Sequence, residues 1–177
     1  MMQDMRTNRE IAMNADPTLE QFFLVSEEKL SKLINAAQIR PTDSVVEVGA
    51  GIGTVARVLP PGASLTVIEL DDRLIDFLRE NVPHARILQG DALKLIQEVS
   101  CDVLISNLPT RVTESLIALL PRLSFRTAVL AVGESTDLNQ LGPEFTWREV
   151  TTITGDDFVP PQSSVSRIVR VSRKNTD

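Results

Sequence analysis

The sequence has a single cysteine, Cys101, and a single histidine, His84. One cysteine cannot form an internal disulfide, and with one histidine it cannot supply a structural zinc site, so no metal is predicted. Cys101 precedes an apolar run, which favours a buried structural thiol, and His84 follows the turn-like pair Val82-Pro83, which favours a surface loop. Hydrolysis by a Ser-His-Asp or Cys-His arrangement therefore has no other residues to draw on.

Long hydrophobic runs and an excess of positive charge are also lacking. No apolar run approaches the ~20 residues that span a bilayer, and residues 1–16 contain no apolar stretch like a secretory signal. These absences predict a soluble, cytoplasmic protein without membrane contact. The net charge of −6 is opposite in sign to the surface of a protein that grips many phosphates. A small basic group near the carboxyl end suits either a solvated strand edge or an RNA contact: Arg167, Arg170, Arg173 and Lys174.

The 177 residues, 42% of them hydrophobic, suit one domain with a real core. Short apolar runs alternate with helical patterns, which predicts an α/β fold, a Rossmann-like seven-stranded sheet that is mostly parallel and covered on both faces. Strands are expected at 45–48, 65–70, 86–88, 103–106 and 127–132, and helices at 55–59, 72–81, 93–99 and 113–120.

The two ends of the chain differ from this alternation. Ser26, followed by Glu27 and Glu28, predicts the N-cap of an amphipathic helix that enters the domain. Two β-rich runs, 145–154 and 165–172, predict a C-terminal antiparallel hairpin that closes the sheet. Residues 1–17 are expected to form a flexible N-terminal extension, and residues 18–177 a single domain.

The strongest motif runs from Glu47 to Gly53, between a predicted strand and a predicted helix. Glycines there let the backbone turn sharply and approach a ligand, and the following helix presents free amides. A nicotinamide-binding turn would need glycine where Thr54 stands, and the phosphate-binding Gly-Lys-Ser/Thr is missing. The acidic-x-Gly-x-Gly-x-Gly pattern that remains resembles that of S-adenosylmethionine (SAM)-dependent methyltransferases. A glycine turn without a ligand is the structural alternative.

Two acids follow at the ends of the next two predicted strands. Glu69 lies 20 residues after Gly49, where a carboxylate can accept two hydrogen bonds from a ribose diol. Asp91 follows the third strand on the same rim and suits an adenine amino group. Either acid alone is more often a helix cap or a solvated charge, but the series from consecutive strand ends favours a cofactor site.

After the fourth predicted strand comes Asn107-Leu108-Pro109-Thr110. This motif resembles the Asn-Leu/Ile-Pro-Tyr/Phe of the ribosomal RNA adenine dimethyltransferases and their macrolide-resistance relatives. The resemblance extends from Gln21 to Val171, and it includes the family's Gln-x-Phe-Leu at 21–24, Gly-Asp-Ala-Leu at 90–93 and Phe-x-Pro at 158–160.

The resemblance implies SAM as the cofactor and a nitrogen nucleophile as the methyl acceptor. The lone pair of an exocyclic amine is delocalised into its ring, so attack on a methyl group is helped by hydrogen-bond acceptors that favour a pyramidal nitrogen. The side-chain oxygen of Asn107 and the carbonyl of Leu108, held by Pro109, would be those acceptors. Thr110 completes the catalytic motif, and Thr110 and Phe158 are the expected substrate contacts. The expected cofactor contacts are Gln21, Leu24, Glu47, Gly49, Ala50, Gly51, Gly53, Glu69, Leu70, Asp91, Ala92 and Asn107.

Two departures from the family leave the acceptor open. Thr110 stands where an aromatic ring would stack on the base, an interaction of roughly 1–3 kcal/mol, and the sequence ends at Asp177, where the ribosomal enzymes usually continue into a helical domain. The leading hypothesis is an N-methyltransferase whose acceptor is a small molecule, a protein or an RNA adenine. The alternatives are a true rRNA adenine N6-methyltransferase that needs a partner or the ribosome, and a catalytically silent SAM-binding regulatory module. A nucleotide-binding oxidoreductase comes last.

Overall fold

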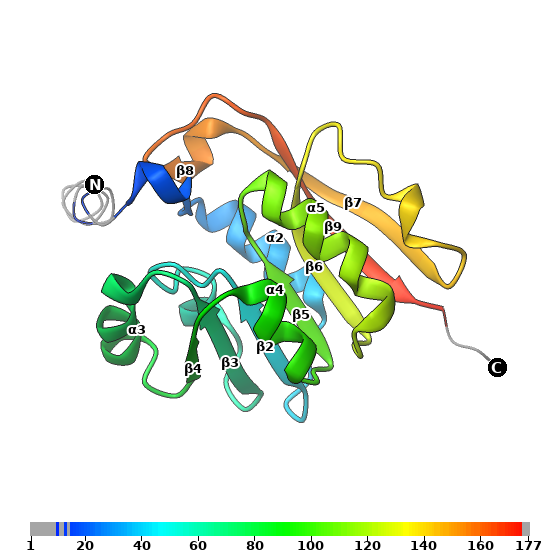
Figure 1. Cartoon of the computed structure of the whole chain (residues 1–177), viewed down its shortest axis with the longest axis horizontal. Coiled ribbons are helices and arrows are strands. Elements are labelled where there is room, and N and C mark those ends of the chain that lie inside the picture. The colour runs from blue at the N-terminus through cyan, green and yellow to red at the C-terminus, as the bar shows by residue number, and fades with distance from the viewer. Residues whose placement is uncertain (1–9, 11–12, 14, 175–177) are drawn as a thin grey trace.

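A mixed seven-stranded sheet forms the centre of the molecule (Figure 1). The computed structural model describes residues 10, 13 and 15–174, so most of the predicted extension at 1–17 lies outside the described residues. The strand order is β4-β3-β2-β5-β6-β9-β7. The first five of these strands are parallel, β9 runs antiparallel to β6, and β7 runs antiparallel to β9. Their bounds are β2 Ser44–Val48, β3 Ser64–Glu69, β4 Arg86–Gln89, β5 Val103–Ser106, β6 Thr127–Gly133, β7 Phe145–Ile153 and β9 Ser166–Arg173. The α/β class and the C-terminal hairpin are confirmed.

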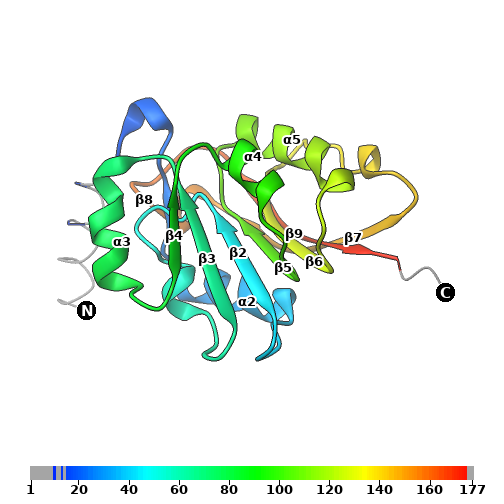
Figure 2. The ribbon, with the colours of Figure 1, turned by 60° about the horizontal axis from the view of Figure 1, so that its bottom comes forward.

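Helices cover both faces of the sheet, as Figure 2 shows. Alternate residues of a strand point to opposite faces, so Val45 packs with α2 (Glu27–Ala37) and α3 (Ile75–Asn81). Its neighbour Val46 packs with the other layer, which contains α4 (Ala92–Leu95) and α5 (Thr110–Leu119). The central strands are buried on both faces, which explains their uninterrupted apolar sequences.

Several helices differ from their predicted extents. The helix expected at 55–59 is a single 3₁₀ turn, η2 (Ala56–Val58), because Leu59 precedes a proline and is held extended. The run 72–81 divides into η3 (Asp72–Leu74) and α3, and the run 93–99 into α4 and η4 (Ile96–Glu98). Ser26 occupies the N-cap position of α2, but its side chain makes no capping hydrogen bond.

A second, two-stranded sheet was not predicted. β1 (Phe23–Leu24) pairs antiparallel with β8 (Phe158–Val159), where Phe23 faces Val159 and Leu24 faces Phe158. Two residues a strand are too few to show a period of two in the sequence. This pairing joins the N-terminal segment (residues 16–24), which includes η1 (Pro17–Leu19), to the connection between β7 and β9. The remaining 3₁₀ turns are η5 (Leu120–Arg122), η6 (Asn139–Leu141) and η7 (Gly155–Asp157).

Cys101 and His84, to which the sequence analysis gave no catalytic or metal-binding role, lie away from the sheet's carboxyl edge. Cys101 is buried, and this burial, together with the nearby Asp102 carboxylate, raises the pKa of its thiol to about 12. His84 is exposed. Within the described part of the chain, no helix is long and apolar enough to cross a membrane, and no cluster of three His, Cys, Asp or Glu side chains could hold a metal ion.

Candidate functional site

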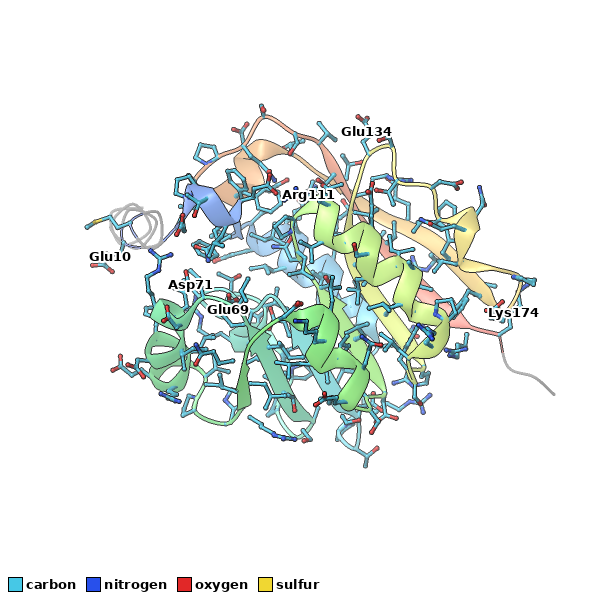
Figure 3. The ribbon with its side chains drawn as sticks, in the orientation of Figure 1. Glu10, Glu69, Asp71, Arg111, Glu134 and Lys174 are labelled. Carbon is cyan, nitrogen blue, oxygen red and sulfur yellow. The ribbon has the colours of Figure 1, made fainter. Side chains whose placement is uncertain are left out.

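A cavity of about 410 Å³ opens at the carboxyl ends of the parallel strands, where ligands of open α/β sheets bind. It lies between the glycine turn after β2, the ends of β3 and β5, and the β1–β8 ribbon. Figure 3 shows Glu69 and the nearby Asp71 after β3, and Arg111 at the start of α5 across from them. Twelve of the predicted site residues line this cavity: Gln21, Gly49, Gly51, Glu69, Leu70, Asp91, Ala92, Asn107, Leu108, Pro109, Thr110 and Phe158.

The glycine turn contacts two other parts of the cavity wall. Gly49 and Gly51 have φ angles of 73° and 57°, in the left-handed region that residues with a Cβ rarely adopt. A Cβ on Gly49 would collide with the side chain of Leu108, and one on Gly51 would lie 2.7 Å from the ring of Phe23. The turn therefore needs glycine both for its backbone and for these close approaches.

Four predicted cofactor residues do not line the cavity. Leu24 and Ala50 are buried in the core beside α2, because β1 and the turn present these side chains to the interior. A Cβ on Gly53 would lie 2.8 Å from Val82 beneath the turn. Glu47 lies on β2, beneath the turn, and is only 2% exposed. Their part in cofactor binding remains a prediction.

Glu69 connects the turn to the end of β3. Its Oε2 accepts a hydrogen bond from the Gly51 amide at 2.7 Å, and its Oε1 accepts one from the Asp71 amide at 2.9 Å. Burial raises the pKa of Glu69, while these amides act in the opposite direction. A carboxylate has about four acceptor sites, so after the amides of Gly51, Asp71 and Leu70 the Glu69 side chain keeps capacity for a further donor at the cavity wall.

Glu47 is a buried acid with an unused oxygen. Its Oε2 has no hydrogen-bond partner among the described residues. Burial and the neighbouring Glu69 carboxylate raise the pKa of Glu47 well above its ordinary value, and the Ala56 amide only partly offsets them. The carboxyl group is therefore disposed to be neutral in the folded protein.

Asp71 and Arg73 were missed by the sequence analysis. Asp71 is 5% exposed and forms an ion pair with Arg73 at 2.6 Å, which lowers the pKa of Asp71. Gln21 donates to Asp71 at 3.0 Å and accepts from the Asp16 amide at 2.7 Å. Arg73 also pairs with Asp16 at 3.0 Å. These contacts hold residues 16–21 at the cavity rim, and no local pattern in the sequence indicates a partnership between residues that are 50 or 57 positions apart.

Asp91 lies where a strand-end acid was expected, and it also caps a helix. It lines the cavity, and its Oδ1 caps α4 by accepting a hydrogen bond from the Leu93 amide at 2.9 Å. The capping interaction fixes the side chain and leaves its other oxygen without a partner in the described structure.

The Asn-Leu-Pro-Thr segment passes from β5 into α5. Pro109 is the N-cap residue, and its carbonyl accepts hydrogen bonds from the amides of Val112 and Thr113 at 2.9 and 3.0 Å. Asn107 and Leu108 are half-buried at the cavity wall, whereas Thr110 is exposed at its rim. Phe158 is 4% exposed and packs in the core beside α2, so it is an anchor of the β1–β8 ribbon as well as part of the cavity wall.

The charge of the cavity wall has one sign. The ionisable side chains among its described lining residues are Glu20, Glu69 and Asp91, and neither lysine nor arginine is present there. Phosphate-binding sites use arginine, lysine or free helix amides. The cavity therefore suits an uncharged or positively charged ligand better than a phosphorylated one.

The sheet, with the glycine turn, the two strand-end acids and the Asn-Leu-Pro segment around one cavity, has the Rossmann-like fold of the SAM-dependent methyltransferases. Within that class, the chain belongs to the ribosomal RNA adenine dimethylase family, whose model matches residues 12–153.

Two similar proteins are named ribosomal RNA small subunit methyltransferase A. That of Dehalococcoides mccartyi strain CBDB1 is 31% identical over 90% of this chain and 63% of its own. That of Malacoplasma penetrans is 36% identical over 67% of this chain and 46% of its own. A solved dimethyladenosine transferase from Plasmodium falciparum superposes with a TM-score of 0.75 at 27% identity, over 86% of this chain and 63% of that one. The chain thus spans less than two thirds of the length of these relatives.

Replacement of Gly49 by alanine tests the contact at the turn. We expect Gly49→Ala to weaken SAM binding more than tenfold, because the new Cβ collides with Leu108 and the φ of 73° is strained. Gly62→Ala is the matched control, since Gly62 also has a positive φ of 104° but its Cβ would make an ordinary contact at 3.6 Å with Pro41. It should lose about 1 kcal/mol of stability and keep its affinity. Equal SAM affinity in the two variants, measured by calorimetry, would contradict the importance of this contact.

The buried carboxyl of Glu47 predicts a pH dependence. Its pKa is raised in the folded state above the ordinary value of 4.5, so its contribution to stability is present at low pH and is lost as the pH rises through the folded pKa. Glu47→Gln cannot ionise, and its free energy of unfolding relative to the parent should therefore increase as the pH is raised. Glu28→Gln should show the opposite trend, because Lys32 lowers the pKa of Glu28. Urea unfolding across the pH range measures both, and a flat difference for Glu47→Gln would show that this carboxyl ionises normally.

Proposed function

We propose that this chain is a SAM-dependent N-methyltransferase that acts on an exocyclic nitrogen. The observation that carries the proposal is that the glycine turn and the Asn-Leu-Pro-Thr segment line one cavity and touch each other through Gly49 and Leu108. The part of the site suited to a methyl donor and the part suited to an acceptor amine are therefore adjacent. Membership of the ribosomal RNA adenine dimethylase family supports the same activity.

The cavity fits SAM in size, charge and hydrogen-bond acceptors. Its volume of about 410 Å³ is within the range of small-molecule sites. A wall whose described residues include no lysine or arginine suits a cofactor that carries no phosphate and has a positive sulfonium. Glu69 has spare acceptor capacity for a ribose diol and Asp91 for an adenine amino group, and Gln21, Leu70 and Ala92 complete this side of the wall. When bound, the cofactor supplies an electrophilic methyl group.

The protein's own contribution at the reacting nitrogen is orientation and electrostatic stabilisation. The side-chain oxygen of Asn107 and the carbonyl of Leu108 accept hydrogen bonds from the amine and favour its pyramidal form. Pro109 limits the backbone freedom of the segment and begins α5. Apolar groups such as Val112 and Phe158 line the same cavity and reduce access of water to the amine.

An RNA adenine is one candidate acceptor. The relatives named as ribosomal RNA methyltransferases favour it. The net charge of −6 and the absence of an aromatic ring at Thr110 favour a small-molecule acceptor, a protein amine, or an adenine presented by a partner or by the ribosome.

A catalytically silent SAM-binding module is the further alternative that Thr110 suggests, and the position of Asn107 and Pro109 at the cavity weighs against it. A cytoplasmic location remains a prediction.

The acceptor class can be found with labelled SAM. The protein is incubated with purified small-subunit ribosomal RNA, with immature small subunits, and with separate protein and small-molecule fractions of the host. Label in immature subunits but not in naked RNA would assign a presented adenine, and label in the protein or small-molecule fraction would replace RNA as the acceptor. Absence of label everywhere, with SAM binding intact, would favour the silent module.

Cofactor binding should depend on Glu69. We expect calorimetry to detect SAM and its demethylated product, and Glu69→Ala to weaken the binding of both. Hydrogen bonds to a charged acceptor contribute roughly 1.5–3 kcal/mol, which corresponds to about a ten- to hundredfold loss of affinity. Glu28→Ala, at an exposed acid on α2, should bind as the parent does. Binding of NADH in place of SAM, or no binding at all, would refute the assignment of the cavity.

Turnover should depend on Asn107 more than cofactor affinity does. Asn107→Ala removes an acceptor that acts mainly at the reacting nitrogen, so kcat should fall far more than the SAM affinity. Asn139→Ala, at an exposed residue of η6, is the control. Methyl transfer by Asn107→Ala within about threefold of the parent, a difference of only ~0.7 kcal/mol, would place Asn107 outside the reaction centre.

A further inference from the structure

The carbonyl of Leu108 lies just outside the hydrogen bonding of α5. The amides at the start of this helix donate to Pro109, one residue later, so no helical amide holds the Leu108 oxygen. The hydrogen bond that this oxygen receives within the described structure comes from the hydroxyl of Thr113, at 3.1 Å. The orientation of the Leu108 carbonyl therefore depends on the Thr113 side chain.

The burial of the Thr113 side chain leaves its hydroxyl dependent on this one hydrogen bond. Its side chain is fully buried at 0% exposure, where a valine of the same shape would pack without a polar atom to satisfy. A threonine inside a helix commonly bonds to the carbonyl four residues earlier. Here that carbonyl belongs to Pro109 and already accepts the Thr113 amide, and the hydroxyl reaches one residue further, to Leu108.

Leu108 is consequently held at both of its ends. Its side chain packs against the Gly49 backbone, in space that a Cβ would occupy. Its carbonyl is held by Thr113. A backbone carbonyl has two lone pairs, so one remains for a second donor after Thr113 has taken the first.

We propose that Thr113 is a positioning residue for methyl transfer. Its hydroxyl sets the orientation of the Leu108 carbonyl, and the second lone pair of this carbonyl accepts a hydrogen bond from the amine that is methylated. The inference rests on the proposed N-methyltransferase activity. Thr113 does not touch the amine itself, because it is absent from the cavity wall. Its effect should therefore appear in kcat, since a small misorientation of a reacting group can cost about a hundredfold in rate.

Three variants separate this role from general stability. Thr113→Val removes the hydroxyl and keeps the shape, and Thr113→Ser keeps the hydroxyl. Thr127→Val makes the same chemical change at another fully buried threonine, at the start of β6 and outside the cavity wall. With labelled SAM and immature small ribosomal subunits as the probe, we expect kcat to fall about ten- to a hundredfold in Thr113→Val, with SAM affinity within about twofold of the parent. Thr113→Ser and Thr127→Val should stay within about threefold in kcat.

The hydrogen bond can also be observed without turnover. The sequence contains Leu-Pro pairs at 59–60, 108–109 and 120–121, so labelling leucine carbonyls with ¹³C and proline with ¹⁵N gives three resolvable carbonyl signals in NMR spectra. Replacement of Leu108 by methionine identifies its signal. Loss of a hydrogen bond should move that signal upfield in Thr113→Val and leave it near the parent position in Thr113→Ser, while the other two signals stay in place.

The outcomes distinguish the inference from the activity on which it rests. A parent protein that labels neither these subunits nor any other acceptor fraction refutes the proposed activity, and the positioning role falls with it, whatever the carbonyl signal shows. If the parent is active on another acceptor, the same variants are compared on that acceptor. An unmoved Leu108 signal in Thr113→Val, a kcat within threefold of the parent, or equal impairment of Thr113→Ser would each overturn the role of Thr113.

Discussion

The close contact between the glycine turn after β2 and the segment after β5 is the constraint on which the site depends. Gly49 leaves room for the Leu108 side chain only because it has no Cβ, and its φ of 73° lies in the left-handed region that residues with a Cβ rarely adopt. β2 and β5 are adjacent in the sheet, so their carboxyl ends present both segments to one cavity. Any residue larger than glycine at this position would have to displace the Leu108 side chain.

Buried acids give the same region its electrostatic character. Glu69 ties the turn to β3 through the Gly51 amide, and Glu47 lies beneath the turn with an unused oxygen. Desolvation raises the pKa of both, so the folded structure carries a cost here that a purely structural turn would avoid. The acids at the cavity wall have no lysine or arginine beside them among the described lining residues, which is consistent with a site for a cationic cofactor. Such electrostatic strain is a common property of functional sites.

Local sequence patterns predicted most of the sheet. The strands β2, β3, β5 and β6 are buried on both faces, and their apolar runs are bounded by turn residues, so their ends were predicted to within two residues. The helices were predicted less well, since η2 is a single turn before Pro60 and α5 begins at Thr110 rather than 113. Ten of the twelve predicted residues that line the cavity stand at or just after the end of a parallel strand, and parallel strands bring their carboxyl ends to one edge. Gln21 and Phe158 come instead from the segment before β1 and from β8.

The sequence by itself determined the α/β class, the glycine turn, the strand-end acids and the Asn-Leu-Pro-Thr motif, because each of these is a short pattern within a few adjacent residues. Only the tertiary structure decided that β1 pairs with β8, that Asp71 and Arg73 hold the N-terminal segment, and that the Thr113 hydroxyl holds the Leu108 carbonyl. The first two depend on residues far apart in the chain, and the third depends on where α5 starts its hydrogen bonds. The first two are not set by local propensity, because they follow from the way in which the packed sheet brings separate segments together.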